Sequence, residues 1–263
     1  TWLEMDYIGD FWKRHGYLLP RRKVVQIGEC RSDHDMLNDL AHRVGQGEHW
    51  WDTFEGGLDY ILEPMGITWQ DFKKMDYIRG EVRYRKYKER GFSTPTKKFE
   101  LYSTRLENWG YDPLPQYREP PESPVSTPEV YEAYPYILIT GRRLAGFFHT
   151  ENRQLSWLRE LHPDPIVEIH PETAQKSGIQ EGDWVVIESP RGKVRQRAKL
   201  FAGMDPRIIS AEHGWWFPEN KDPGHGWDES NINILTDNAY ETCDPAMGAT
   251  SVRTLLCRIY PET

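Results

Sequence analysis

Apolar residues recur at helical spacing in the first part of the chain, residues 1–117. The segment "SDHDMLNDLAHRVG" has Ser32 at the position of a helix N-cap, apolar residues at three- and four-residue intervals, and Gly45 as a stop signal. A second helix is predicted after Thr68 in "TWQDFKKM", and alternation in "KKFELYS" predicts a strand over residues 99–102. We therefore expect this first part to be α/β.

Residues 118–135, "REPPESPVSTPEVYEAYP", interrupt both periodicities because they are rich in proline and acidic residues. Proline cannot continue a helix and is excluded from central strands. We therefore predict a linker or an extended wrap between two regions, with residues 136–263 as the second.

Short strands separated by turn signals dominate residues 136–263. "YILIT" is typical of a buried strand, and "VEIHPETAQKSG" predicts a strand followed by a short helix from Pro171 to Gly178. "DWVVIESPRGKVRQRAKLF" predicts a hairpin with strands over 184–188 and 193–200, and "DPRIISAEH" and "TLLCRIY" predict further strands. This pattern favours a small β-barrel with short helices over a doubly wound parallel sheet.

Composition excludes some classes of function. A formal charge of −8 and a pI near 5.6 argue against nucleic acid as a partner, because binding to a phosphate backbone requires a basic surface. No apolar run is long enough for a transmembrane helix. The chain begins without an initiator Met or a signal peptide, which indicates an internal part of a longer protein.

The three cysteines suggest neither a disulfide framework nor a metal site. Cys30, Cys243 and Cys257 are odd in number and show no C-x-x-C spacing. Free cysteine is among the most buried residue types. We therefore expect core thiols.

Three polar clusters follow predicted strands. The first is "ITGRRLAGFFHTENRQ", residues 139–154; the second is "AEHGWWFPE", where Trp216 and Phe217 are expected in a core or interface; the third is "NINILTDNAYETCDP". Asn231 is expected in a solvent-facing turn, and Asp244 and Pro245 in a structural turn before the last strand. Taken singly, a T-G-R sequence at a strand end is more typical of a turn, and His149 and Thr150 of a helix start, than of a binding site.

The order of these segments, together with "VEIHPETAQKSGIQEGDWVVIESPRGKVRQRAKL", resembles the C-terminal domain of the molybdopterin-dinucleotide oxidoreductases, the dimethyl sulfoxide reductase family. The form "HGWWFPE" is similar to the subgroup of thiosulfate and polysulfide reductases and acetylene hydratase. The resemblance implies that residues 1–117 are the end of an α/β catalytic region and that residues 136–263 form a six-stranded double-psi barrel of the aspartate-decarboxylase kind. One departure is Lys97, where the family usually has a glycine in a tight turn.

The same resemblance implies a cofactor, two molybdopterin guanine dinucleotides holding molybdenum or tungsten. Thr140, Gly141 and Arg142 would then contact the pyrophosphate, which requires backbone N–H groups and charged donors; Arg143 is an alternative to Arg142. The remaining implied cofactor contacts, most of them to the pterin, are Phe148, His149, Thr150, Asn152, Gln154, His213, Trp215, Asn233, Thr236 and Asp237. We expect these positions to converge on one cleft.

The family's metal ligand and its cysteine motif for an iron–sulfur cluster are absent from this sequence. The resemblance therefore implies the cofactor-clamping part of a larger oxidoreductase, inactive alone, with no catalytic or metal-ligating residue of its own. Its partners would be the remainder of the catalytic subunit and, in some members, an iron–sulfur electron-transfer subunit.

Two alternatives stay open at this point: an accessory dinucleotide-binding subunit without its own chemistry, and a double-psi barrel used only for protein contacts. The lack of a Gly-Ser dipeptide argues against a self-cleaving decarboxylase of the same fold. Polar clusters at several strand ends argue against a pure interaction module.

Overall fold

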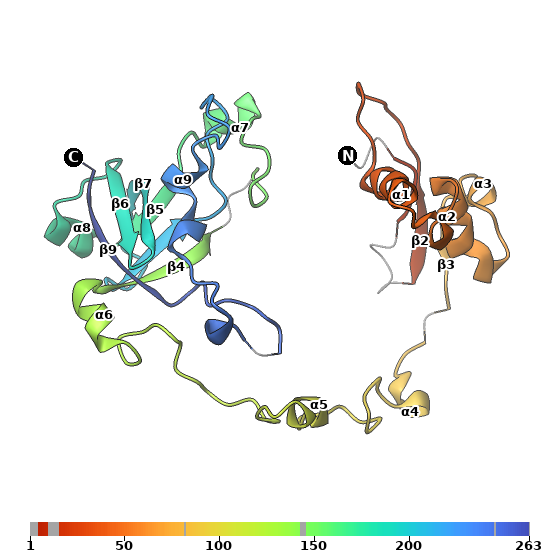
Figure 1. Ribbon diagram of the computed structural model, residues 1–263, viewed down its shortest axis with the longest axis horizontal. Coiled ribbons are helices and arrows are strands. Elements are labelled where there is room, and N and C mark those ends of the chain that lie inside the picture. Colours follow the sequence, from red (N-terminus) through yellow and green to blue (C-terminus); the bar gives the residue numbers. More distant parts are fainter. Residues whose placement is uncertain (1–4, 10–15, 82, 143–145, 245, 263) are drawn as a thin grey trace. The chain divides into compact units, whose positions relative to one another are not determined.

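The computed structural model describes residues 5–9, 16–81, 83–142, 146–244 and 246–262, and the chain divides into two compact units, Thr1–Phe99 and Glu100–Thr263 (Figure 1). Within these described ranges, no helix is long and apolar enough to cross a membrane.

The first unit combines a small antiparallel sheet with short helices. Its elements are β1 (Tyr7–Gly9), β2 (Tyr17–Arg21), α1 (Asp33–Arg43), α2 (Phe54–Leu62), α3 (Trp69–Phe72), β3 (Ile78–Arg79) and α4 (Tyr87–Arg90), and the strand order is β1-β2-β3. Both predicted helix starts are confirmed. The Ser32 hydroxyl accepts a hydrogen bond from the N–H of the third residue of α1, and the Thr68 hydroxyl accepts one from the third residue of α3. The core of this unit includes Leu58, Leu62 and Trp69.

The strand predicted over residues 99–102 is wrong. The segment is irregular and finds no partner strand among the described residues, and Phe99 and Leu101 are 70% and 76% exposed. Alternation alone does not make a strand, because the ladder hydrogen bonds need a neighbour. Just before it, Lys97 has φ +59° in a turn, the left-handed conformation that favours glycine.

The proline-rich segment is an anchored wrap on the second unit. It contains a short helix that the sequence analysis did not predict, α6 (Pro128–Ala133), which follows α5 (Thr104–Asn108). Proline is compatible with the first turn of a helix, because the N–H that it lacks would have no helical partner there. Upstream of α6, the Glu122 carboxylate binds Arg191 on the barrel.

The second unit is built on a closed barrel of six strands in the order β4-β8-β5-β7-β6-β9. The strands are β4 (Tyr136–Arg142), β5 (Ile166–Ile169), β6 (Trp184–Ser189), β7 (Gly192–Leu200), β8 (Ile208–Glu212) and β9 (Leu255–Pro261). β4–β8 and β5–β7 are parallel pairs and the other pairs are antiparallel. The predicted six-stranded barrel with short helices, here α7 (Ser156–Leu161), α8 (Pro171–Ser177) and α9 (Trp227–Ser230), is confirmed, and its topology is consistent with a double-psi barrel.

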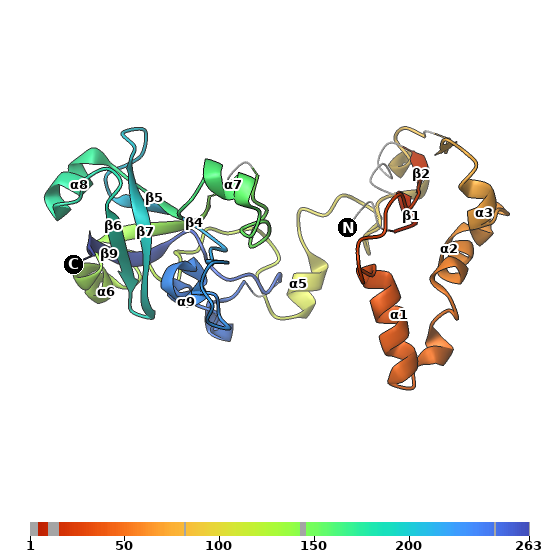
Figure 2. The same ribbon diagram turned by 90° about the horizontal axis from the view of Figure 1, so that it is seen from above.

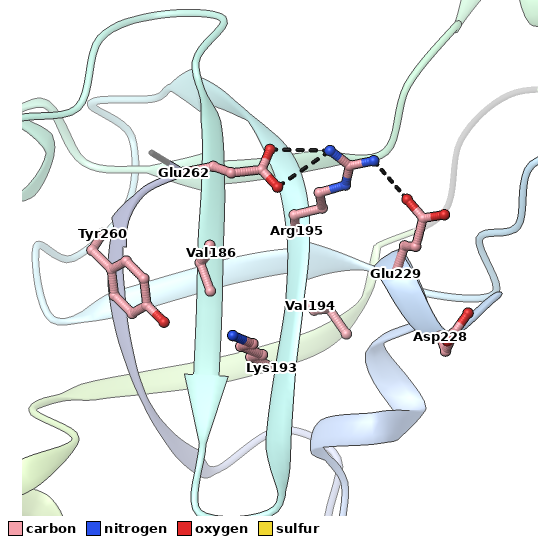
Figure 3. A pocket seen from close by; sticks show the side chains of 8 residues that line it. All are labelled: Val186, Lys193, Val194, Arg195, Asp228, Glu229, Tyr260 and Glu262. Atoms are coloured by element: carbon pink, nitrogen blue, oxygen red, sulfur yellow. Dashed lines mark hydrogen bonds and ion pairs between the residues drawn. The ribbon is translucent and has the colours of Figure 1, made fainter. Parts of the chain in front are cut away.

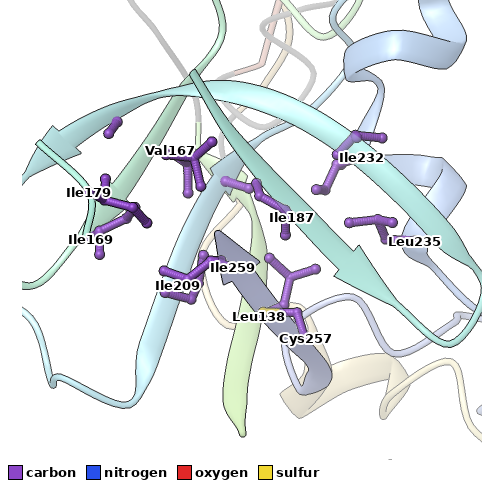
Figure 4. Close-up of a cluster of buried hydrophobic side chains, with 14 of the residues drawn as sticks. Leu138, Val167, Ile169, Ile179, Ile187, Ile209, Ile232, Leu235, Cys257 and Ile259 are labelled. Atoms are coloured by element: carbon purple, nitrogen blue, oxygen red, sulfur yellow. The ribbon is translucent and has the colours of Figure 1, made fainter. Parts of the chain in front are cut away.

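Alternate residues of the strands fill the barrel (Figure 4). Val185 and Ile187 of β6 are fully buried, whereas the alternate residues Trp184, Val186 and Glu188 are only partly covered, as the period of two requires. Cys257 lies in this core, where burial raises the pKa of its thiol, so the prediction of a core thiol is right for Cys257. It is wrong for Cys30, which is exposed, and Cys243 is intermediate.

A carboxylate on β6 connects β6 to β9 and makes barrel stability depend on pH. Glu188 accepts hydrogen bonds from Arg258 at 2.6 Å and Tyr260 at 2.7 Å, and these hold its pKa below the usual value. A lowered folded-state pKa contributes stability above the unfolded pKa of about 4.3, and the contribution is lost as pH falls through the lower folded value. We expect Glu188→Gln to lower the free energy of unfolding by less than about 1 kcal/mol at pH 7, because the Glu188–Arg258 pair is partly solvated.

Denaturant unfolding from pH 7 to pH 3 checks this. The difference in the free energy of unfolding between wild type and Glu188→Gln should become smaller below about pH 4.3. Glu160→Gln is the matched control, because the Glu160 side chain is exposed on α7 and makes no hydrogen bond to the described residues. A difference that stays constant down to pH 3 would contradict the role given to the Glu188 charge.

Candidate functional site at the ends of β4 and β8

The parallel pairing of β4 and β8 places the first two polar clusters next to each other. Arg142 of β4 is in register with Glu212 of β8, so the two strands end side by side. Two orthogonal views place α7 and α9 at this end of the barrel and α8 at the other (Figures 1 and 2). Ends of neighbouring parallel strands are a common location for ligand sites in sheets.

Direct contacts join the two loops. The His149 Nδ1 and His213 Nε2 atoms are 2.9 Å apart, and Trp216 Nε1 donates to the Thr150 carbonyl at 2.7 Å. Gly214 has φ +70°, and a Cβ placed on it would lie 2.8 Å from the His149 carbonyl carbon and oxygen. The two loops therefore pack backbone against backbone at a position that requires glycine.

The third cluster begins beside the end of β8. The buried Gln196 side chain bonds both the N–H and the carbonyl of Glu212, and it also donates to the Ser230 carbonyl at 3.3 Å. Ser230 ends α9, and Asn231 then caps the 3-10 helix η4 (Ile232–Leu235) by accepting from Asn233 N–H. Gln196 therefore ties the start of the third cluster to the strand end from which the second cluster leaves.

Within the third cluster, only one of the candidate side chains is without a local hydrogen bond. The Thr236 hydroxyl donates to the Asn233 carbonyl at 3.0 Å, and Asp237 accepts from Ala239 N–H at 2.9 Å. The exposed Asn233 amide side chain makes no hydrogen bond to any described residue. Asp244 accepts from Ala246 and Met247 N–H groups in a turn, and Pro245 lies outside the described residues.

The first cluster divides between the end of β4 and the loop. The Thr140 hydroxyl donates to the Val252 carbonyl at 2.8 Å, and Gly141 has φ +95° with no atom within 4 Å of a Cβ placed on it. The Arg142 backbone belongs to β4, whereas Arg143 lies outside the described residues. In the loop, Phe148 and Gln154 are exposed, and the Asn152 side chain donates to the Gly146 carbonyl at 3.4 Å.

Sequence reasoning did not identify the buried layer under the loop. Arg153 is 3% exposed, and its guanidinium carbon lies 4.3 Å from the ring centre of Phe147 and 4.8 Å from that of Trp215. Burial lowers the pKa of Arg153 to about 10. Trp215 is fully buried here, and Phe217 packs against it. An arginine within "HTENRQ" looks like a surface residue, so no local signal indicated this position.

A separate pocket of about 480 Å³ lies on the outer face of the barrel (Figure 3). Its lining residues are Val186, Lys193, Val194, Arg195, Asp228, Glu229, Tyr260 and Glu262. Arg195 bonds both Glu229 and Glu262, so its charge is already neutralised. None of the candidate residues lines this pocket, and the β4–β8 end remains the candidate site. Within the described ranges, no three His, Cys, Asp or Glu residues are grouped as metal ligands.

Comparison with known proteins identifies the domain that carries this end of the barrel. Residues 136–255 match the family model of the molydopterin dinucleotide binding domain. The chain is 45% identical over 177 residues, 66% of its length, to dopamine dehydroxylase of Eggerthella lenta, and 32% identical over 261 residues to acetylene hydratase of Syntrophotalea acetylenica. The structure of acetylene hydratase from Pelobacter acetylenicus matches 99% of this chain with a TM-score of 0.88 and 30% identity, and the match covers 37% of that protein.

Fold and family match together define residues 136–255 as a molydopterin dinucleotide-binding domain. The chain that carries it is homologous to the C-terminal part of the dimethyl sulfoxide reductase family enzymes, and acetylene hydratase is one of these relatives. The chain spans 17% of the length of dopamine dehydroxylase and 36% of the length of acetylene hydratase.

Proposed function

We propose that this chain is the cofactor-clamping part of a molybdenum or tungsten oxidoreductase that holds two molybdopterin guanine dinucleotides. The observation that carries the proposal is the convergence of polar loops where parallel strands β4 and β8 end together, with His149 bonded to His213 across them. We further propose that the remainder of the catalytic subunit supplies the metal ligand and any iron–sulfur cluster, so that this chain alone is inactive. An electron-transfer subunit is a further proposed partner.

Several groups at this end of the barrel fit such a cofactor. Gly141 leaves open space where a side chain would otherwise stand, which allows a phosphate to approach the backbone, and Arg142, the next residue, is the proposed charged donor. The Asn233 amide has both a donor and an acceptor free of local bonds among the described residues, which suits a heterocycle edge.

The cofactor and the residues of this chain would have different roles. When bound, the cofactor's metal supplies the two-electron or Lewis-acid chemistry, whereas the residues of this chain bind and orient the cofactor. The remaining proposed contacts are Thr140, Phe148, His149, Thr150, Asn152, Gln154, His213, Trp215, Thr236 and Asp237. The names of two relatives refer to acetylene and dopamine as substrates. We propose that the substrate of this enzyme is determined by the remainder of the catalytic subunit.

Replacement of Arg142 tests the phosphate part of the proposal. Loss of a charged hydrogen-bond donor costs roughly 1.5–3 kcal/mol, or about one to two powers of ten in affinity. We expect Arg142→Ala in the complete enzyme to lower the molybdopterin guanine dinucleotide content per chain, measured after extraction and oxidation. Arg143→Ala is the control and should lower it less. Unchanged cofactor content in both variants would contradict a phosphate contact here.

Replacement of Asn233 tests the pterin part. Asn233→Ala should leave most of the cofactor in place but shift the reduction potential of the metal centre, because a lost hydrogen bond to the pterin alters its electronics and not its phosphate anchors. A potentiometric titration followed by electron paramagnetic resonance measures this. An unchanged potential with unchanged kcat would show that Asn233 does not contact the pterin.

A further inference from the structure

Arg153 bonds the backbone of the candidate cofactor loop from beneath. Its Nη2 donates to the His149 carbonyl at 2.8 Å and its Nη1 to the Glu151 carbonyl at 2.9 Å. The same guanidinium lies against the faces of Phe147 and Trp215. One buried side chain thus fastens the loop to the aromatic residue that follows β8.

These two bonds fix which way the neighbouring N–H groups point. A trans peptide is planar, and its N–H points opposite to its C=O. The His149 carbonyl shares a peptide with Thr150 N–H, and the Glu151 carbonyl shares one with Asn152 N–H. Because both carbonyls point to Arg153, the N–H groups of Thr150 and Asn152 point away from it, and neither donates a hydrogen bond to any described residue.

Two residues of the loop have a left-handed backbone, and Arg153 bonds the carbonyl of one of them and the carbonyl that precedes the other. His149 has φ +50° and Asn152 has φ +70°, left-handed conformations that are uncommon for non-glycine residues, although Asn and His adopt them more often than most others. In this segment His149 and Asn152 have positive φ, and Thr150 and Glu151 between them do not. A left-handed residue next to a right-handed one leaves neighbouring N–H groups on one side, where they bind anionic or carbonyl oxygens. The loop therefore offers a pair of donors in a backbone conformation that Arg153 holds.

Arg153 is buried without a carboxylate of the described residues at hydrogen-bond distance, but the charge of Glu212, itself 1% exposed, acts on it and favours its charged form. Nearby, Arg159 bonds Glu219 at 2.9 Å and His162 bonds Glu212 at 3.0 Å, whereas Arg153 bonds only backbone carbonyls among the described residues. The Glu212 charge and the two aromatic faces offset part of the cost of burying this cation, and its hydrogen bonds go to the loop backbone.

We propose that Arg153 is a positioning residue that turns the Thr150 and Asn152 N–H groups toward acceptor oxygens of the bound dinucleotide, phosphate or pterin carbonyl. This inference rests on the proposed function for its ligand but not for the role of Arg153 in ordering the loop. The two parts are therefore tested by different measurements.

Amide hydrogen exchange of the full chain tests the ordering role without cofactor. The reporter is the Glu151 N–H, which bonds the Phe148 carbonyl at 2.9 Å inside the loop. We expect it to exchange about tenfold faster in Arg153→Met, while amides of β6 and β7 keep their wild-type rates. Arg159→Met is the matched control, because Arg159 also lies over Trp215, at 5.3 Å, but donates to no loop carbonyl in the described structure.

Cofactor content of the complete enzyme tests the ligand part. We expect Arg153→Met to hold about tenfold less molybdopterin guanine dinucleotide per chain, and Arg153→Lys an intermediate amount because lysine still donates to one carbonyl. If Arg153→Met does not fold, the Arg153→Lys measurements decide. Equal loop exchange in wild type and Arg153→Lys or Arg153→Met would overturn the positioning role. Faster loop exchange together with a wild-type enzyme that holds no pterin dinucleotide would instead overturn the proposed function and the ligand.

Discussion

Gly214→Val should lower the free energy of unfolding of the barrel unit by roughly 2–5 kcal/mol, because it combines backbone strain with a clash. A left-handed residue with a side chain costs roughly 1–2 kcal/mol, and overpacking adds about 1–3 kcal/mol. At Gly214 the atoms in the way are the carbonyl group of His149 at 2.8 Å and the Thr150 nitrogen at 3.1 Å, which are backbone and cannot turn aside. The His149 loop should move, and cofactor content should fall with it.

Gly178→Val separates strain from clash. Gly178 has φ +68°, nearly the same conformation, but no atom lies within 4 Å of a Cβ placed on it. We expect Gly178→Val to lower the free energy of unfolding by about 1–2 kcal/mol, from backbone strain alone, and to leave the cofactor content unchanged. Denaturant unfolding and pterin extraction measure both variants. Equal stability losses in the two would mean that the loop contact at Gly214 is not what requires glycine.

The elements of the barrel could be predicted because local signals and tertiary structure agree there. In α8, Pro171 begins the helix and Gly178 ends it in the left-handed conformation, as the sequence indicates. In the β6–β7 hairpin, buried and partly covered residues alternate along each strand, and the buried ones face the barrel interior. Agreement between local pattern and global fold is typical of sequences that fold to one structure.

The failures share one cause, which is that partners distant in sequence decide the outcome. Residues 99–102 alternate like a strand but lack a neighbour among the described residues, and Cys30 is exposed because its segment packs against little. Arg153 is buried because Trp215, far along the chain, covers it. The sequence indicated which loops carry polar groups, but it could not indicate which arginine supports them from below.

Glu122→Ala should destabilise the barrel unit by roughly 2–4 kcal/mol, although Glu122 belongs to a segment with the composition of a linker. Its carboxylate accepts both Arg191 Nη groups, at 2.7 and 3.0 Å, and also the Leu256 N–H of β9 at 2.5 Å. Removing it leaves a largely buried guanidinium and a backbone N–H without this acceptor. Unsatisfied buried donors cost more than the lost bonds alone.

The effect should reach the candidate site, because Arg191 Nε also donates to the Leu235 carbonyl at 2.7 Å, in the same short helix as Asn233. We expect faster amide exchange in residues 231–237 of Glu122→Ala. In a double-mutant cycle with Arg191→Ala, the losses of unfolding free energy should be far from additive, because each change breaks the same hydrogen-bond network. Glu129→Ala is the control, because the Glu129 side chain is exposed on α6 and makes no hydrogen bond to the described residues. If Glu122→Ala and Glu129→Ala unfold at the same denaturant concentration, the proline-rich segment is only a linker, and the third cluster is held by the barrel alone.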